Sequence, residues 1–251
     1  MQITILGSGT NMHPRRAAAG YLIATDRPIL LDFGPRTLPN LLKTGLDRHT
    51  IQHLIFTHYH ADHFSDFITF FFDAVCHALY GGGSRGALHI YGPPGTKRLF
   101  GTLLDTIPVF SSAPFKVMLR EVHRRPFHIG QTKIIPIPMT HTDSQVCLGY
   151  RFAYQGRTAS FSGDAMASDN LIKICRGVDV AIMDCSFSSR SPGASHMHAE
   201  QCGKVASEAQ VKKLVLSHFY PLADRSNVVK QAGKYFSGKI IKAKDLLHLQ
   251  V

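Results

Sequence analysis

Short apolar runs separated by turn residues fill the first part of the chain and predict β-strands. These runs are residues 3–6, 20–25, 28–34 and 51–58. The first three have the spacing of hairpins, which predicts an antiparallel start. Residues 37–45 carry apolar side chains at helical spacing and end on Gly45, a residue typical of the position just after a helix.

The remainder of the chain mixes strand-like runs with helical patterns. Helices are predicted at residues 64–80, 93–107, 168–176, 198–210 and 224–236. Strands are predicted at residues 87–92, 115–122, 132–139, 148–154, 157–164, 178–187, 212–218 and 239–245, and the last is expected to end the sheet. Strands at hairpin spacing precede strands that alternate with helices, and this order recurs in the second half. The pattern therefore predicts two mixed β-sheets face to face with helices outside.

Composition limits the class of protein. The chain has 251 residues, of which 44% are hydrophobic and 18% charged, so it is a globular protein rather than a disordered one. We find no linker and no repeat, and we expect a single domain over residues 1–251. The net charge of +11 favours anionic partners, although a generally basic surface without a ligand is the alternative.

Cysteine usage and hydropathy bear on the compartment. The five cysteines form no CxxC pair, which is typical of a reduced cytoplasmic protein and not of a disulfide scaffold. The first residues, MQITILGSGT, read as a strand rather than a signal peptide. Because no apolar run approaches the ~20 residues of a membrane span, we expect no membrane association.

The candidate chemistry is concentrated in FTHYHADHFSD, residues 56–66. In an extended chain, side chains two positions apart point the same way, so His58 and His60 can aim at one point. Asp62 and His63 follow where the chain turns into a helix, and they aim at a second point nearby. Neutral imidazoles suit one divalent cation, and a carboxylate with an imidazole suits another. The alternative is a histidine-rich polar loop.

Three further residues follow apolar strands in the second half: His141, Asp164 and His218. Functional residues collect at the C-terminal edges of strands in open sheets. We therefore expect His58, His60 and His141 to bind one metal ion. The second ion would be held by Asp62, His63 and His218, with Asp164 bridging the two.

Three segments carry a family resemblance: THYHADH (57–63), SGDA (162–165) and LSHF (216–219). They resemble the metallo-β-lactamase fold superfamily and, within it, the ribonuclease Z and cyclic phosphodiesterase branch. The resemblance implies an αβ/βα four-layer sandwich, a dinuclear site that usually holds zinc, the ligand roles given above, and hydrolysis. Histidine and carboxylate ligands also accept manganese and iron, so the metal stays open.

The segment SHMHAEQ (195–201) resembles the HxTAE element of ribonuclease Z, whose histidine touches the scissile phosphate. His196 matches that histidine, while His198 stands where the family has threonine, so either can be the catalytic histidine. Two cations about 3.5–4 Å apart can share a water and lower its pKa toward about 7. Asp62 would orient the resulting hydroxide, and a protonated His196 would offset charge or protonate the leaving oxygen.

The interval between His141 and Asp164 is only 23 positions. Ribonuclease Z usually places a long tRNA-binding arm there, whereas this chain has a hairpin pattern. We therefore expect a phosphodiesterase for a small nucleotide-like or cyclic phosphodiester, with RNA and tRNA processing less favoured. Hydrolysis of an ester, thioester or lactone is the alternative on the same fold. A non-catalytic nucleic-acid-binding protein is a third reading, which the intact ligand set disfavours.

The segment FITFFFDAVCHALY (67–80) is more apolar than a helix with one buried face should be. We interpret it as core. The alternative is a homodimer contact, which the family resemblance also implies.

Overall fold

The computed structural model describes residues 1–11, 13–81, 83, 85–189 and 195–251. Its first sheet has seven strands in the order β14-β1-β2-β3-β4-β5-β6. The bounds are β1 Gln2–Gly7, β2 Gly20–Ala24, β3 Pro28–Phe33, β4 His53–Ile55, β5 Leu88–Gly92, β6 Val117–Glu121 and β14 Leu247–Gln250. Pairing is antiparallel from β14 to β3 and parallel from β3 to β6.

The second sheet repeats this arrangement with the order β13-β12-β11-β10-β9-β8-β7. The bounds are β7 Phe127–Ile129, β8 Thr132–Met139, β9 Cys147–Tyr154, β10 Arg157–Phe161, β11 Val180–Asp184, β12 Lys213–Ser217 and β13 Lys239–Lys242. Pairing is antiparallel from β7 to β10 and parallel from β10 to β13. Each half thus begins with hairpins and continues with helical crossovers, as the sequence pattern predicts.

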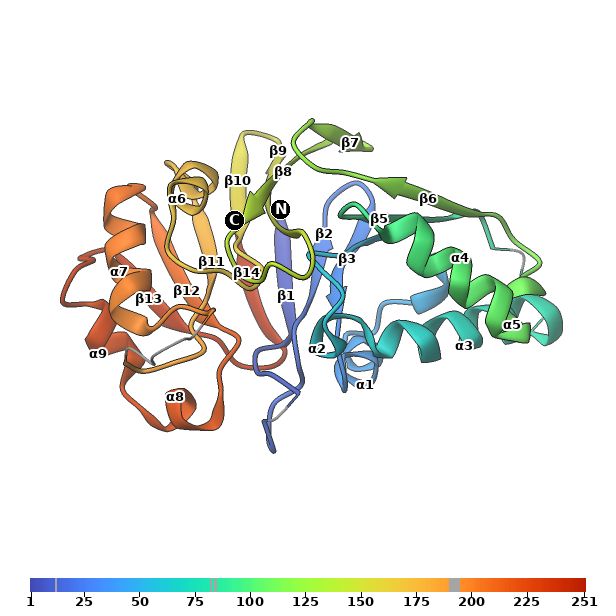
Figure 1. The fold of residues 1–251 in the computed structure, drawn as a ribbon, viewed down its shortest axis with the longest axis horizontal. Helices are drawn as coiled ribbons and strands as arrows, with labels where there is room; N and C mark the ends of the chain where they lie inside the picture. Colours follow the sequence, from blue (N-terminus) through green and yellow to red (C-terminus); the bar gives the residue numbers. More distant parts are fainter. Residues whose placement is uncertain (12, 82, 84, 190–194) are drawn as a thin grey trace.

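Helices cover the outer faces of the two sheets (Figure 1). On the side of the first sheet lie α1 Thr37–Lys43, α2 Ala61–Phe64, α3 Asp66–Tyr80, α4 Thr96–Thr106 and α5 Pro108–Ser111. On the side of the second lie α6 Asp169–Cys175, α7 Ala199–Glu208, α8 Pro221–Arg225 and α9 Val228–Ala232. The predicted αβ/βα sandwich of two mixed sheets is confirmed. None of the described helices is long and apolar enough to cross a membrane.

Two apolar cores hold these layers. The larger includes Ile3, Ile23 and Phe152, which the two sheets bury between them, and it extends under α6 and α7. The second is rich in phenylalanine and joins the first sheet to α3 and α4, where Phe67 and Phe100 are fully buried with ring centroids 5.1 Å apart. Such aromatic contacts add to the free energy of area burial. The helices are therefore anchored firmly enough to position the loops that they flank.

The helix α3 is core on one face, as predicted, but it also exposes apolar side chains. Phe67, Phe70 and Phe71 are at most 1% exposed. By contrast, Phe72 is 51% exposed and Tyr80 is 84% exposed. The excess apolar content of this segment therefore lies partly on the surface.

Several predicted elements are wrong in their bounds. The helix expected at 64–80 is interrupted at Ser65, where the single turn α2 ends and Asp66 accepts a hydrogen bond from the amide of Leu38 (2.8 Å). The helix expected at 224–236 is two short helices, because Ser226 is extended and Asn227 caps α9 by accepting from the amide of Lys230. The strand expected at 51–58 contains only three residues, so the histidine cluster begins in a loop.

The end of the chain also differs from the prediction. The strand expected at 239–245 is β13, which does end the second sheet, but the chain then continues into β14, which crosses to the first sheet and pairs with β1. The short elements β7 and α5 were not predicted either. The hairpin expected between His141 and Asp164 is present: β9 and β10 pair directly, with Tyr154 opposite Arg157. That interval therefore holds a two-stranded hairpin and no long arm.

Candidate metal centre

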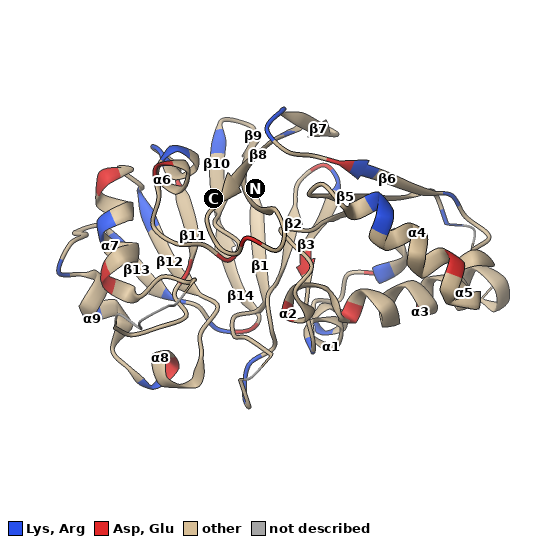
Figure 2. Ribbon diagram, viewed as in Figure 1, with Lys and Arg blue, Asp and Glu red and all other residues tan. Residues whose placement is uncertain are grey.

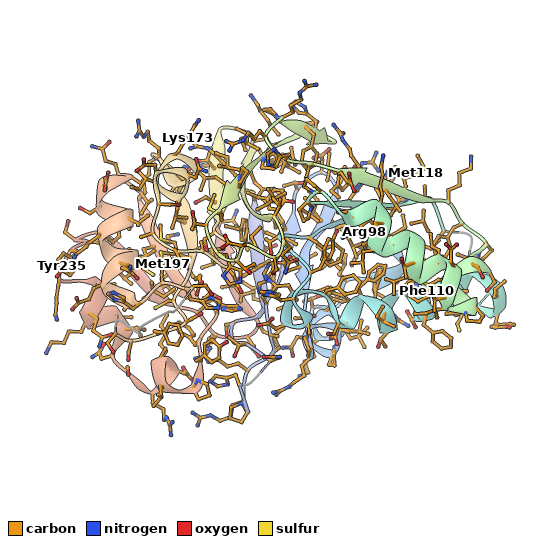
Figure 3. All side chains as sticks on the ribbon, in the orientation of Figure 1. Arg98, Phe110, Met118, Lys173, Met197 and Tyr235 are labelled. Carbon is orange, nitrogen blue, oxygen red and sulfur yellow. The ribbon has the colours of Figure 1, made fainter. Side chains whose placement is uncertain are left out.

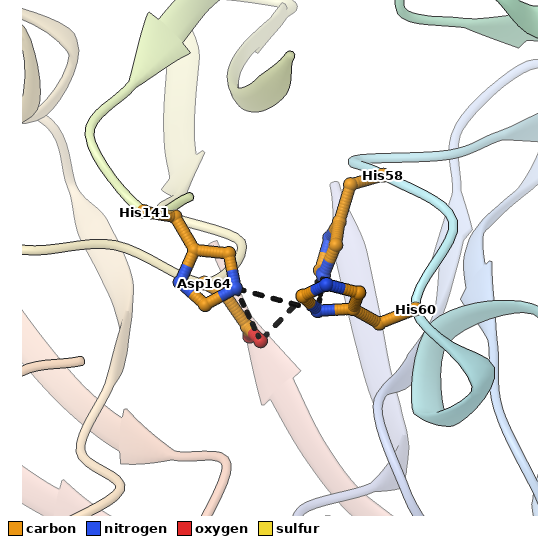
Figure 4. A group of neighbouring side chains, drawn as sticks. All are labelled: His58, His60, His141 and Asp164. Carbon is orange, nitrogen blue, oxygen red and sulfur yellow. Dashed lines mark hydrogen bonds and ion pairs between the residues drawn. The ribbon is translucent and has the colours of Figure 1, made fainter. Parts of the chain in front are cut away.

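All seven predicted ligands converge on one place between the sheets, at loops that follow strands. His58, His60, Asp62 and His63 lie in the loop after β4 and in α2, while His141, Asp164 and His218 follow β8, β10 and β12. Figure 4 shows His141 and Asp164 facing His58 and His60 from the other sheet. Residues about 160 positions apart in the chain are thus brought together by the pairing order of the two sheets.

The first group consists of His58, His60, His141 and one oxygen of Asp164. The Nε2 atom of His58 lies 3.0 Å from Nδ1 of His60, which lies 3.4 Å from Nε2 of His141. Oδ2 of Asp164 is 3.6 Å from Nε2 of His58 and 3.7 Å from Nε2 of His141. Three imidazoles and a carboxylate therefore aim at a common centre (Figure 4).

The second group consists of Asp62, His63 and His218, with the other oxygen of Asp164 beside it. Oδ1 of Asp164 lies 3.0 Å from Nε2 of His63 and 3.2 Å from Nε2 of His218. Nε2 of His218 is also 3.4 Å from Oδ2 of Asp62. Asp164 therefore presents one oxygen to each group, which is the geometry of a bridging carboxylate.

The spacings of these contacts are close to those between ligands of one divalent cation. Two ligands about 2.0–2.2 Å from a shared tetrahedral ion lie roughly 3.3–3.6 Å apart, close to the spacings found in both groups. Oδ1 of Asp164 is buried and accepts no hydrogen bond with acceptable geometry, although two imidazole nitrogens lie within 3.2 Å. A buried carboxylate oxygen without a donor is costly unless it coordinates a cation. The cluster is therefore compatible with a divalent metal site.

A second layer of residues orients the imidazoles. Oδ2 of Asp32 lies 2.8 Å from Nδ1 of His63, and its two oxygens also accept from the amide and hydroxyl of Thr57. Nδ1 of His141 donates to the carbonyl of Ser195 (2.9 Å), and Nδ1 of His218 lies 3.0 Å from the hydroxyl of Ser186. Engaging Nδ1 leaves Nε2 of His63, His141 and His218 directed at the centre, whereas His60 presents Nδ1 to it.

Burial and neighbouring charges together set the pKa values of these groups. Burial lowers the pKa of His58 well below its ordinary value, with neighbouring imidazoles adding to the effect. Burial also opposes protonation of His63, but the carboxylates of Asp164 and Asp32 outweigh it and raise its pKa well above normal. Asp164 keeps a pKa well below normal despite its burial, because His218 and His63 surround it. The carboxylate of Asp164 is therefore charged although it is buried.

His196 and His198 occupy different environments. Nδ1 of His196 donates to Oδ2 of Asp184 (2.8 Å), and its ring centroid lies 4.7 Å from that of His141. His198 is the N-cap residue of α7, and its amide donates to Oε1 of Gln201. Burial opposes protonation of His196, but Asp184 outweighs it and raises the pKa of the imidazole.

Sequence reasoning missed the supporting residues Asp32, Asp184 and Ser186. Asp184 is the last residue of β11, an apolar strand, and so it shares the strand-end position of the predicted ligands. Its position at the end of an apolar strand is therefore a sequence signal that could have identified Asp184. Asp32 lies within the predicted strand 28–34, where it has a positive φ of 54° and its carboxylate contacts His63.

Comparison with known proteins identifies the family of the chain. Residues 27–219 match the beta-lactamase superfamily domain. The chain belongs to the beta-lactamase superfamily. The match includes every residue of both groups, from His58 to His218. The sequence-based recognition of this fold is therefore confirmed.

Solved structures extend the comparison. The metallo-beta-lactamase fold protein YhfI of Bacillus subtilis superposes with a TM-score of 0.86 at 25% identity, over 99% of this chain and 98% of that protein. In sequence YhfI is 26% identical over 248 residues, which is 97% of each chain. The short form of human tRNase Z superposes with a TM-score of 0.79 at 19% identity, over 100% and 99% of the two chains. A diphosphatase from the PhnP family gives 0.77 at 22%, over 100% and 97%. The last two show a shared fold.

Proposed function

We propose that the protein is a metal-dependent phosphodiesterase that acts on a small nucleotide-like or cyclic phosphodiester. In this proposal His58, His60 and His141 hold one divalent cation, and Asp62, His63 and His218 hold the other, with Asp164 bridging. Zinc is the first candidate for both positions, since four-coordinate nitrogen and oxygen sites suit it. The convergence of all seven side chains supports this assignment.

The observation that carries the proposal is the Asp184–His196 pair beside the cluster. Nδ1 of His196 is bound to Asp184, so Nε2 is the nitrogen left for a substrate. Nδ1 of His196 also lies 3.9 Å from Oδ2 of Asp164, so the ring stands at the edge of the first group. A cationic imidazole at that position suits a reaction that develops negative charge on phosphoryl and leaving oxygens.

The chemistry divides between the metal ions and the side chains. Two bound cations would supply Lewis acidity and a water of lowered pKa. Among the side chains, Asp62 is assigned the role of proton acceptor, and its support is that Oδ2 lies at the edge of the second group, 3.4 Å from Nε2 of His218. His196 donates a proton from Nε2 to the leaving oxygen, and Asp184 holds the ring in the orientation that this transfer needs.

Two relatives by fold support a phosphoryl substrate, because one is named a tRNase and another a diphosphatase. The net charge of +11 also favours an anionic substrate. A small substrate is preferred over tRNA because the β9–β10 hairpin occupies the interval where a long arm would be needed.

The test is replacement of His196 by alanine, with His198→Ala as the matched control. We expect His196→Ala to lower kcat by about 10²–10⁴-fold on a diester with an alkoxide leaving group, with metal content unchanged. The loss should be much smaller on bis-p-nitrophenyl phosphate, since p-nitrophenolate leaves without a proton. His198→Ala should retain activity on both substrates, because His198 caps α7.

Two outcomes would contradict the proposal. One is unchanged activity of His196→Ala on every phosphodiester tested. The other is a panel in which lactones, esters or thioesters are hydrolysed by the unmodified protein far faster than any phosphodiester, which would favour the alternative hydrolase.

A further inference from the structure

The loop after β4, which carries two of the proposed ligands, is hydrogen-bonded to the second sheet. The hydroxyl of Tyr150, in β9, donates to the carbonyl of Phe56 (2.9 Å). The amide of Leu148, also in β9, donates to the carbonyl of Thr57 (2.9 Å). Phe56 and Tyr150 are fully buried, so the hydroxyl satisfies a carbonyl that is shielded from bulk water.

A third hydrogen bond holds the same loop two residues further on. The amide of Tyr59 donates to Oε1 of Gln145 (3.1 Å), which lies in the connection between β8 and β9. Tyr59 stands between His58 and His60 in the sequence, so this bond fixes the backbone between two proposed ligands. We call these three hydrogen bonds the cross-sheet contact.

The strand β9 lies between the two strands that lead to the other ligands proposed for the first group. It pairs with β8, and His141 follows two residues after Met139, the last residue of β8. It also pairs with β10, and Asp164 follows three residues after Phe161, the last residue of β10. The side chains that face one another in Figure 4 therefore belong to segments that the cross-sheet contact joins through β9.

The spacing of the first group depends on segments from both sheets. Nε2 of His58 is 3.6 Å from Oδ2 of Asp164, and Nδ1 of His60 is 3.4 Å from Nε2 of His141. Metal–ligand distances in proteins vary by only about 0.2 Å. A small shift of the loop after β4 relative to β8 and β10 would therefore take a ligand away from a shared ion.

The second group is anchored in other ways. A Cβ atom on Gly34 would lie 1.9 Å from the carbonyl oxygen of Asp62, so α2 packs closely against the chain after β3. Asp32, in β3, contacts the imidazole of His63. Neither contact involves β9. Loss of the cross-sheet contact is therefore expected to affect the two groups unequally.

The cross-sheet contact contains no charged side chain. Residues 56–59 and 145–150 include no Lys, Arg, Asp or Glu, and the loop after β4 is tan in Figure 2. We propose that Tyr150 and Gln145 are positioning residues for the first metal ion, because they hold the loop after β4 at the distance from β8 and β10 that a shared ion needs. The inference rests on the ligand assignment within the proposed function and not on the substrate.

The test is Tyr150→Phe, which removes one hydroxyl and keeps both the ring and the net charge. We expect one of the two zinc ions to bind about tenfold more weakly and the other to stay within about twofold, because the carbonyl of Phe56 loses its donor. Stepwise removal of zinc from the loaded protein by a chromophoric chelator gives both affinities. In a His60→Ala background, which lacks a proposed ligand of the first ion, Tyr150→Phe should leave the affinity of the remaining ion unchanged.

The control for a general loss of stability is Phe110→Leu. Phe110 is 2% exposed, and its ring stacks on that of Phe71 with centroids 4.3 Å apart. It lies in α5, at the end of the molecule away from the candidate metal centre (Figure 3). Phe110→Leu should lower the urea midpoint, as Tyr150→Phe does, and leave both zinc affinities unchanged.

Gln145 offers a second position that is only half-buried, so its variants are expected to fold. Gln145→Ala removes the acceptor for the amide of Tyr59 and should weaken the same ion as Tyr150→Phe. Gln145→Glu keeps an acceptor oxygen and should restore the affinity when measured at raised salt, which screens its added charge. A role in stability alone would not produce this difference.

The results separate this inference from the proposed function. If Tyr150→Phe and Gln145→Ala leave both zinc affinities unchanged, or if Phe110→Leu lowers them as much, the cross-sheet contact does not position the ligands and the proposed function stands. An equal effect of Tyr150→Phe in the His60→Ala background would also overturn the inference. If Tyr150→Phe weakens one ion but the unmodified protein hydrolyses no phosphodiester, the inference stands and the proposed function is wrong. If the unmodified protein binds no metal ion, both are wrong.

Discussion

At the scale of single residues, the candidate metal centre is supported by buried side chains outside the two groups of candidate ligands. Asp32 is the clearest case, since it is 1% exposed, has a left-handed backbone with φ of 54°, and accepts from His63 and Thr57. Asparagine tolerates the same left-handed backbone, so Asp32→Asn preserves the local fold. The substitution removes the negative charge of Asp32 that holds the proton on Nδ1 of His63.

We expect Asp32→Asn to weaken binding of the metal ion held by His63 by about 10–100-fold, as outer-sphere carboxylates commonly do. The measurement is a competition titration against a chromophoric chelator. Asp26→Asn is the control, because Asp26 accepts from the amide of Gln131 in a surface turn. Equal metal affinity in the two variants would show that Asp32 does not orient His63.

The residues that bind in the proposed site were recoverable from the sequence because their types and strand-end positions are visible in it. Asp32 and Ser186 were not, because their role depends on a contact with a residue distant in the sequence. His63 lies 31 positions from Asp32, and His218 lies 32 positions from Ser186.

At the scale of elements, glycines differ in whether the fold leaves room for a side chain. The end of a strand can require glycine, whereas a glycine in a helix can be replaced. A Cβ atom on Gly7, at the end of β1, would lie 1.6 Å from the carbonyl oxygen of Ala18. A Cβ on Gly101, within α4, would meet nothing within 4 Å. The same substitution therefore has opposite expected effects at the two positions.

Gly7→Ala should destabilise the protein by about 4 kcal/mol or more, because the backbone of the neighbouring segment must move. Gly101→Ala should stabilise it by about 0.5–1 kcal/mol through the helix preference of alanine. Urea denaturation of both variants gives the two values. A similar midpoint for both would mean that the close approach of β1 to Ala18 is not a constraint.

Elements with long, regular patterns were predicted well, and short ones were not. The helix expected at 224–236 failed because Ser226 adopts an extended conformation that ends α8, and Asn227 starts a new helix. The strand β14 was missed because four residues carry too little pattern and their partner, β1, is at the other end of the chain.

At the scale of the whole molecule, Asp224 joins distant parts of the chain. Its carboxylate contacts Arg16 (2.6 Å), Lys242 (3.0 Å) and His13 (3.1 Å). Partial burial opposes ionisation of Asp224, but Arg16 and Lys242 outweigh it and hold the pKa well below its usual range. The N-terminal loop, α8 and β13 are therefore tied together by one charge.

This coupling predicts a pH dependence of stability. Because the folded-state pKa of Asp224 lies below its unfolded value of about 3.9, the stabilisation is fully present above that pH and is lost as pH falls toward the folded pKa. We expect Asp224→Asn to lower the urea midpoint at pH 7, with the difference from the unmodified protein shrinking between about pH 4 and pH 3. Asp105→Asn, on the exposed side of α4, is the control. A difference independent of pH would exclude the ionic contribution.

The sequence by itself determined the fold class, the alternation of strands and helices, and the identities of the seven residues that converge. Periodicity is a local property of the sequence, and the residue types of the seven side chains can be read from it directly. Only the tertiary structure decided that Asp164 presents one oxygen to each group and that Asp184 holds His196. These facts depend on contacts across two sheets, and side-chain direction at a strand end is set by packing with partners remote in the chain.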